Sequence, residues 1–113
     1  MKPVLAIHRE DDNELLGYVR QNEATWEALT IFGYAFATVS TAEQARALVL
    51  EQGLSILSGT WEYYDDESAE WLPCALVEVS ADRARVARMD GPYADTSKTY
   101  LITSSVATKL RKG

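Results

Sequence analysis

The spacing of hydrophobic and polar residues changes along the chain and separates strand-like segments from one helical segment. In "TWEALTIFGYAF", residues 25 to 36, alternate residues share a face, which is the period of two expected of a β-strand. A short apolar run at residues 4 to 8 and the segment "ELLGYVRQ" flank the polar turn "EDDN", residues 10 to 13. The pattern predicts a hairpin followed by a third strand, which Gly33 bends or bulges.

The segment "VSTAEQARALVLEQGL", residues 39 to 54, carries the clearest helical signal. Ser40 can cap the helix through its hydroxyl while Glu43 reaches back to the amide of the capping residue. Apolar residues at helical spacing form a buried stripe that consists of Ala42, Ala45, Leu48 and Val49. Gly53 is placed to take the left-handed conformation that ends many helices. We therefore predict one principal helix at about residues 41 to 52.

The remainder of the chain is predicted to be β-structure, in the four segments "LSILSGTWEYY", "EWLPCALVEV", "RARVARM" and "KTYLITSS". The turns between them are short, which favours antiparallel neighbours. The predicted fold is α+β, with a mainly antiparallel sheet or a partly closed small barrel in the order βββ-α-ββββ. We expect one domain over residues 1–113, composed of three strands plus the helix (1–53), a second strand set (54–104) and a mobile basic tail (105–113).

The size and composition of the chain suit a small protein that folds without covalent or metal support. At 113 residues and 47% hydrophobic content, it can bury one core of ordinary size. Cys74 is the only cysteine, so no intrachain disulfide can form. No apolar run is long enough for a membrane helix, and the first residues do not read as a signal peptide. We expect a cytoplasmic protein that does not contact a membrane.

The net charge of −6 opposes a general phosphate-binding role, because nucleic-acid binders depend on clustered Lys and Arg. Basic residues nevertheless gather late in the chain, where Arg83, Arg85 and Arg88 form a candidate basic face. Charges at such spacing are more often a solvated strand surface. Two alternatives involving nucleic acid follow: an accessory factor that uses the late basic residues, or an acidic mimic of nucleic acid.

No residue pattern indicates catalysis. His8 and Cys74 are far apart in sequence, and one histidine with one cysteine cannot build the usual zinc site. The carboxylates of residues 11–12 and 65–67 lie in predicted turns, where they are solvated and bond to backbone amides. The chain has neither a Gly-rich phosphate loop nor a serine elbow. We expect a non-enzymatic protein that needs no metal and no cofactor.

The stretch "SGTWEYYDDESAEWLPCALVEV", residues 58 to 79, carries apolar side chains on both faces of a predicted hairpin. In a half-solvated sheet one face should be polar, so the extra aromatics are either covered or exposed as a contact surface. The candidate binding surface consists of Trp61, Tyr63, Tyr64, Trp71 and Tyr93. Core packing explains the same rings, and a cage of rings and carboxylates around a cation is a further alternative.

One further pattern lies in the predicted strands around residues 71–86. The first strand begins with an aromatic residue, continues with alternating apolar residues, and is followed by a tight turn and a second apolar strand. The residues of this pattern are Trp71, Ala75, Val77, Val79 and Val86. In this pattern residues 61–103 resemble the SH3-like and Tudor-like small barrels. The resemblance implies a small barrel that binds a peptide or a cationic side chain through its aromatic residues.

The leading hypothesis is a protein-interaction module, an accessory or regulatory protein whose contact surface lies on the Trp61–Trp71 hairpin. Its partner is another protein or a second copy of the chain. We slightly favour a homodimer, because two-fold pairing is the commonest way for a soluble protein to cover a spare apolar face.

Overall fold

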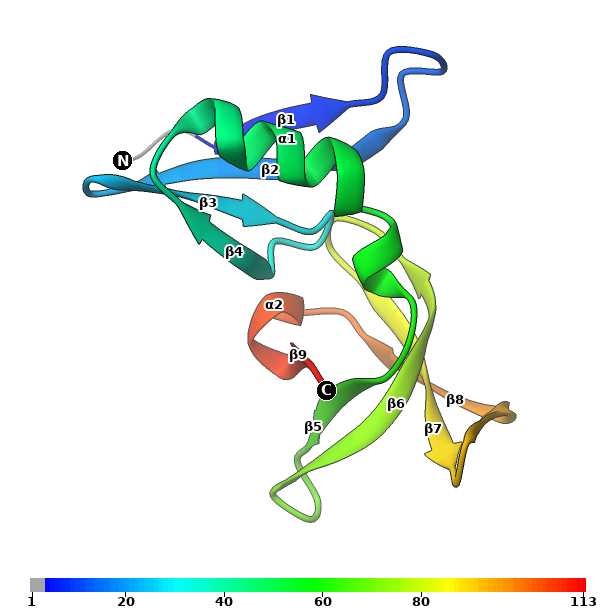
Figure 1. Ribbon diagram of the computed structural model, residues 1–113. Helices are drawn as coiled ribbons and strands as arrows, with labels where there is room; N and C mark the ends of the chain where they lie inside the picture. Colours follow the sequence, from blue (N-terminus) through cyan, green and yellow to red (C-terminus); the bar gives the residue numbers. More distant parts are fainter. Residues whose placement is uncertain (1–3) are drawn as a thin grey trace. The chain divides into compact units, whose positions relative to one another are not determined.

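The computed structural model describes residues 4–113, whose contacts divide the chain into two compact units. Unit 1 is Met1–Leu57 and unit 2 is Ser58–Gly113. Each unit has its own antiparallel sheet, and unit 1 also contains the principal helix (Figure 1). The predicted α+β class with antiparallel sheets is therefore confirmed, whereas the single-domain prediction stays a prediction.

Unit 1 is a four-stranded meander with one helix packed on its sheet. Its strands lie in the order β1-β2-β3-β4, each antiparallel to the next. Their bounds are β1 Val4–His8, β2 Leu15–Asn22, β3 Thr25–Leu29 and β4 Ala35–Val39. Helix α1, Ala42–Gln52, follows β4 and contacts all four strands, and the short 3-10 helix η1, Ser55–Leu57, ends the unit.

The segment predicted as one long third strand is two strands joined by a tight turn. The amide of Thr30 donates to the Tyr34 carbonyl at 2.8 Å, and the Thr30 hydroxyl accepts from the Tyr34 amide at 3.1 Å. Gly33 has a φ of 88°, which favours glycine, and its amide donates to the Thr30 carbonyl. The prediction of three strands before the helix was wrong, because Gly33 reverses the chain here instead of bulging a continuous strand.

The helix occupies nearly the predicted residues, but its cap lies one position later. The Thr41 hydroxyl accepts from the Gln44 amide at 3.1 Å, and the Gln44 side chain accepts in turn from the Ser40 amide at 3.2 Å. Thr41 therefore replaces Ser40 as the capping residue, and Gln44 replaces Glu43 as its partner. Ala45 and Val49 of the predicted stripe are fully buried, and Ala42 and Leu48 are partly buried.

Gly53 ends the helix for a reason that the sequence pattern did not suggest. Its φ of −54° is right-handed, so the predicted left-handed conformation was wrong. A Cβ at this position would lie 2.4 Å from the Leu16 carbonyl oxygen and 2.5 Å from that of Val49. Glycine is needed because the backbone of β2 passes very close to the end of α1.

The core of unit 1 lies between the helix and the sheet. It consists of Ile7, Leu16, Val19, Ala28, Ala45 and Val49.

Unit 2 is a five-stranded antiparallel sheet in the order β8-β7-β6-β5-β9. The strand bounds are β5 Trp61–Asp65, β6 Glu70–Val79, β7 Ala84–Asp90, β8 Tyr93–Ile102 and β9 Leu110–Lys112. The first four strands follow one another as a meander, and the short helix α2, Val106–Lys109, leads the chain back so that β9 pairs with β5 (Figure 1). Among the described residues no ladder joins β8 to β9, so the sheet is not a closed barrel.

The residues predicted as a mobile basic tail are part of this sheet. Val106 and Leu110 are 5% and 1% exposed, and the Gly113 amide donates to the Thr60 carbonyl at 3.1 Å. The prediction for residues 105–113 was wrong because it weighed their charge, whereas two buried apolar side chains fix the segment. The observed order of elements is ββββ-α-ββββ-α-β, apart from the short η1.

Candidate binding groove

The two faces of the β5–β6 hairpin differ in what covers them. Trp61 lies opposite Cys74 and Tyr64 lies opposite Trp71 in the register of the two strands. Since side chains alternate along a strand, Trp61 and Tyr63 share one face, here called the inner face, and Tyr64 and Trp71 share the outer face. Trp61 is 0% and Tyr63 5% exposed. Core packing therefore accounts for these two rings of the candidate surface.

On the outer face, the last strand of the chain places Arg111 over the ring of Trp71. The rings of Tyr64 and Trp71 meet edge to face with their centroids 5.5 Å apart. The guanidinium carbon of Arg111 lies 4.3 Å from the Trp71 ring centroid, and its Nε donates to the Glu62 carboxylate at 2.7 Å. The Trp71 ring and the Glu62 carboxylate could have held an external cation, but both contact the guanidinium of Arg111 instead.

Lys112 makes a similar contact on the inner face. Its Nζ lies 5.4 Å from the centroid of the Trp61 ring and donates to the Ser58 carbonyl. Burial lowers the pKa of this lysine. Both tryptophans of the hairpin therefore contact basic side chains from β9. These contacts form because β9 pairs directly with β5.

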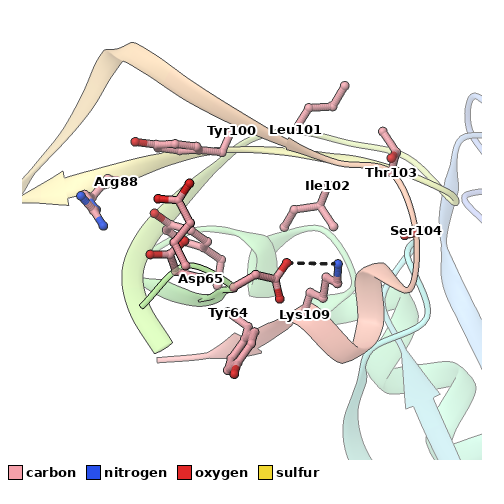
Figure 2. Close-up of a pocket in the computed structure, with 12 residues that line it drawn as sticks. Tyr64, Asp65, Arg88, Tyr100, Leu101, Ile102, Thr103, Ser104 and Lys109 are labelled. Carbon is pink, nitrogen blue, oxygen red and sulfur yellow. Dashed lines mark ion pairs between the residues drawn. The ribbon is translucent and has the colours of Figure 1, made fainter. Parts of the chain in front are cut away.

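A groove of about 540 Å³ opens on the inner face at the turn end of the hairpin. The hairpin contributes Tyr63 and the residues up to Glu67, β7 contributes Arg88, and α2 contributes Lys109. The end of β8 and the residues after it, 100–104, line the opposite side. Figure 2 shows Arg88 and Lys109 at opposite ends of this arrangement, with Tyr100 and Asp65 between them.

Two stacked tyrosines form part of the apolar lining of the groove. The rings of Tyr63 and Tyr100 lie 5.7 Å apart between centroids and are inclined by 22°. Burial raises the pKa of the Tyr63 hydroxyl, and Arg88 acts in the opposite direction through its charge and a hydrogen bond to this hydroxyl. The hydroxyl is therefore protonated at neutral pH and can donate a hydrogen bond. Tyr100 is 42% exposed, so part of its ring is open to a ligand.

The charged groups of the groove are only partly neutralised within the chain. Asp66 lies 3.8 Å from the Lys109 ammonium, the ion pair drawn in Figure 2. Asp65 accepts a hydrogen bond from the Ser68 hydroxyl at 2.9 Å. Within residues 4–113, neither Asp65 nor Glu67 forms an ion pair, and neither does Arg88. The groove therefore offers two carboxylates and one guanidinium to a ligand.

The other predicted site residues lie apart from the groove or point away from it. In Figure 2 the Tyr64 ring points away from Tyr100, in agreement with its place on the outer face. Tyr93 is 77% exposed at the start of β8 and does not line the groove. The aromatic residues named from the sequence are thus divided among the core, the outer face, the groove and an exposed strand end.

The three arginines of the candidate basic face are also divided. Arg85 lies opposite Leu101 and Arg88 lies opposite Cys74, so the two arginines project from opposite faces of β7. Arg85 donates to the Thr99 hydroxyl at 3.2 Å and lies 3.8 Å from the Glu78 carboxylate. Arg83 lies 3.7 Å from the Asp82 carboxylate. Only Arg88 belongs to the groove.

Sequence reasoning missed most of the residues that line the groove, and the three turn carboxylates and Tyr100 show why. The carboxylates Asp65, Asp66 and Glu67 were interpreted as solvated turn residues, with a cage of rings and carboxylates around a cation as the alternative, although a turn beside a sheet face can also form the rim of a groove. Tyr100 was not singled out. Its alternation with Ile102 could have placed both residues on one face, but no local signal indicates that this face meets Tyr63.

The described residues carry no arrangement typical of metal or thiol chemistry. Within residues 4–113, no group of three or more His, Cys, Asp or Glu side chains is placed to hold a metal ion. Cys74 is fully buried, which raises the pKa of its thiol to about 12, and Glu62 contributes to the rise. The thiol is protonated at neutral pH and is a poor nucleophile. His8 is exposed on β1 in unit 1.

Comparison of the chain with protein-family models, with curated proteins and with solved structures finds no match. In the part of the chain that the structure describes, neither α1 nor any other helix has the length and hydropathy to cross a membrane.

Proposed function

We propose that the chain is a non-enzymatic protein-interaction module and that it binds a partner segment in the groove at the turn end of the Trp61–Trp71 hairpin. One observation carries the proposal: the carboxylates of Asp65 and Glu67, which have no ion-pair partner among residues 4–113, border a groove with stacked tyrosines. Aromatic surface beside unpaired charge is typical of protein-binding sites, because the rings supply contact area and the charges select the partner.

The charge of the groove and of the whole chain favours a basic partner segment. A Lys or Arg side chain between Asp65 and Glu67 gains charge-assisted hydrogen bonds, and its aliphatic part can pack on Tyr100. The net charge of −6 attracts such a partner at a distance and increases the rate of encounter. The same carboxylates repel the phosphates of a nucleic acid.

We also propose that unit 2 is a partly closed barrel of the SH3-like or Tudor-like kind. The proposal is supported by its meander of four strands, by the short helix α2 and by the return of β9 to the edge of β5. The interaction function does not depend on this likeness, because it rests on the groove residues alone.

A peptide-binding experiment with the full chain tests the interaction function. Fluorescent peptides would carry one central Lys or Arg among Thr and Val residues, and matched peptides would carry Gln at the central position. We expect the basic peptides to bind, and the double variant Asp65→Asn with Glu67→Gln to weaken their binding about tenfold or more. Asp90→Asn is the control, because Asp90 is exposed at the end of β7 and lies outside the groove.

The outcomes of this experiment separate the proposal from a nonspecific charge effect. Equal losses for the Asp90→Asn control and the groove variant would mean that net charge alone attracts the peptides. Equal binding of the Lys and Gln peptides would contradict the proposal that the partner segment is basic. The two alternatives involving nucleic acid and the homodimer stay predictions.

A further inference from the structure

We propose that the partner segment binds as an added β-strand on the free edge of β8, with its basic side chain in the groove. This inference rests on the proposed function, because it gives the mode in which the same site takes the same class of partner. Strand addition to a sheet edge is a common mode of peptide recognition, in which backbone hydrogen bonds supply affinity and alternate side chains supply specificity.

The edge of β8 is unpaired in the described structure. β8 is the end strand of the sheet, and within residues 4–113 it pairs with β7 alone. A free edge exposes backbone N–H and C=O groups that another chain can bind. The opposite end of the sheet, β9, is only three residues long and carries Arg111 and Lys112, two features that discourage further pairing.

The second half of β8 lacks the features that usually protect an edge. The register with β7 is irregular between Thr99 and Ala94, where Asp95 and Lys98 interrupt the edge with charge. From Thr99 to Ile102 the register is regular, and no charged residue or proline occurs between Thr99 and Thr108. Tyr100 and Leu101 in this stretch are 42% and 48% exposed. This short segment is therefore open to strand addition.

The unprotected part of the edge is also the part that borders the groove. Residues 100–104 line one side of it, and Asp65 at the end of β5 and Glu67 in the following turn also line it. In Figure 2 the side chains of Leu101 and Ile102 point in opposite directions, and Ile102 points towards Lys109. A strand added along β8 follows the same alternation. Every second side chain of the partner would face the groove, and the intervening ones would lie beside Leu101.

Charge complementarity defines the occupant. The segment carries a Lys or Arg where a side chain enters the groove, since Asp65 and Glu67 are the carboxylates available there. Its neighbours are uncharged and suited to an extended backbone, since the facing stretch of β8 is uncharged. A second copy of the chain is the other occupant that the experiment must distinguish.

A backbone-methylation scan of the best basic peptide from the binding experiment tests the inference. N-methylation removes one backbone N–H at a time and leaves every side chain of the peptide unchanged. For an added strand, binding should fall about tenfold at every second position and change little at the positions between them. Hydrogen exchange of the full chain should show that the amides within Thr99–Ile102 that do not bond to β7 exchange more slowly when the peptide is bound.

A pair of protein variants gives a second measurement. Leu101→Lys adds a positive charge beside the added strand and should weaken the binding of the basic peptide about tenfold. Val77→Lys adds the same charge on β6, where Val77 is 43% exposed and does not line the groove, and it should leave binding unchanged. Equal effects of the two substitutions would contradict the proposed position of the strand.

The possible results also separate this inference from the function on which it rests. Binding that requires Asp65 and Glu67 but tolerates methylation at every position would overturn strand addition and leave the interaction function in place. If no basic peptide binds, both proposals are overturned. If the chain pairs with itself along β8, the free-edge amides within Thr99–Ile102 will become protected with rising protein concentration in the absence of peptide, and the hetero-partner inference fails.

Discussion

Arg111 lies over the ring of Trp71, with its guanidinium carbon 4.3 Å from the ring centroid, and its Nε donates to Glu62 at 2.7 Å. The contact joins the last strand of the chain to the outer face of the β5–β6 hairpin. It places a basic residue on an aromatic side chain that the sequence offered as a site for an external cation. The C-terminal residues therefore stabilise the hairpin that forms one side of the groove.

Arg111→Ala is expected to lower the free energy of unfolding by about 1 kcal/mol, because a partly exposed cation–π contact and an ion pair are both lost. Urea denaturation of the full chain measures the change. Lys98→Ala is the control, since Lys98 is exposed and forms no ion pair within residues 4–113. A midpoint that is the same for the two variants would show that the Arg111 contact contributes nothing.

The two tryptophans of the hairpin should respond differently to truncation. Trp61→Ala should cost about 3 to 5 kcal/mol, because Trp61 is fully buried in unit 2. Trp71 is only partly buried, so Trp71→Ser should cost less and leave the far-ultraviolet spectrum intact. Trp71 is therefore the position at which to test the homodimer by sedimentation. A wild-type chain that sediments as a monomer at high concentration would contradict the homodimer.

The cap of α1 can be assigned by two single substitutions. Thr41→Ala should cost about 1 kcal/mol, because the Gln44 amide loses its acceptor. Ser40→Ala should change the free energy of unfolding by no more than about 0.5 kcal/mol, since Ser40 takes part in the cap through its backbone amide. Thermal or urea unfolding compares the two variants. The reverse order of costs would place the cap at Ser40.

Gly53→Ala should destabilise the protein although the backbone at Gly53 is helical. In an exposed helix the same substitution gains up to about 1 kcal/mol. Here the added Cβ meets the Leu16 carbonyl oxygen at 2.4 Å, so we expect a loss of about 1 to 3 kcal/mol. Urea denaturation provides the measurement. A stabilised variant would mean that β2 and the end of α1 can separate at little cost.

The buried thiol of Cys74 gives a prediction in pH. Burial raises its pKa from 9.0 to about 12. The stability gained from the neutral thiol is fully present below pH 9.0, and it is lost as the pH rises from 9.0 through about 12. At pH 8 we expect alkylation by iodoacetamide to be about a hundredfold slower in the folded chain than in denaturant. Mass spectrometry follows the reaction. Equal rates would show that the thiol is accessible in the native state.

The sequence by itself determined most of the elements. A period of two and helical spacing are local properties, so they located α1 to within one residue at its start and identified the hairpin strands of unit 2. The same locality explains the missed turn between β3 and β4. Alternation continues through residues 25–36, and only the hydrogen bonds of Thr30 and the φ of Gly33 divide the segment.

Tertiary structure alone decided the groove. Tyr100 reaches Tyr63, and Lys109 reaches Asp66, because the register of the sheet and the return of β9 to β5 bring them together. Arg111 and Glu62 are 49 positions apart in the sequence, yet they form an ion pair. Periodicity reports which side of a strand a residue occupies. It cannot report which strand lies opposite, because that choice depends on burying residues such as Val106 and Leu110 from a distant part of the chain.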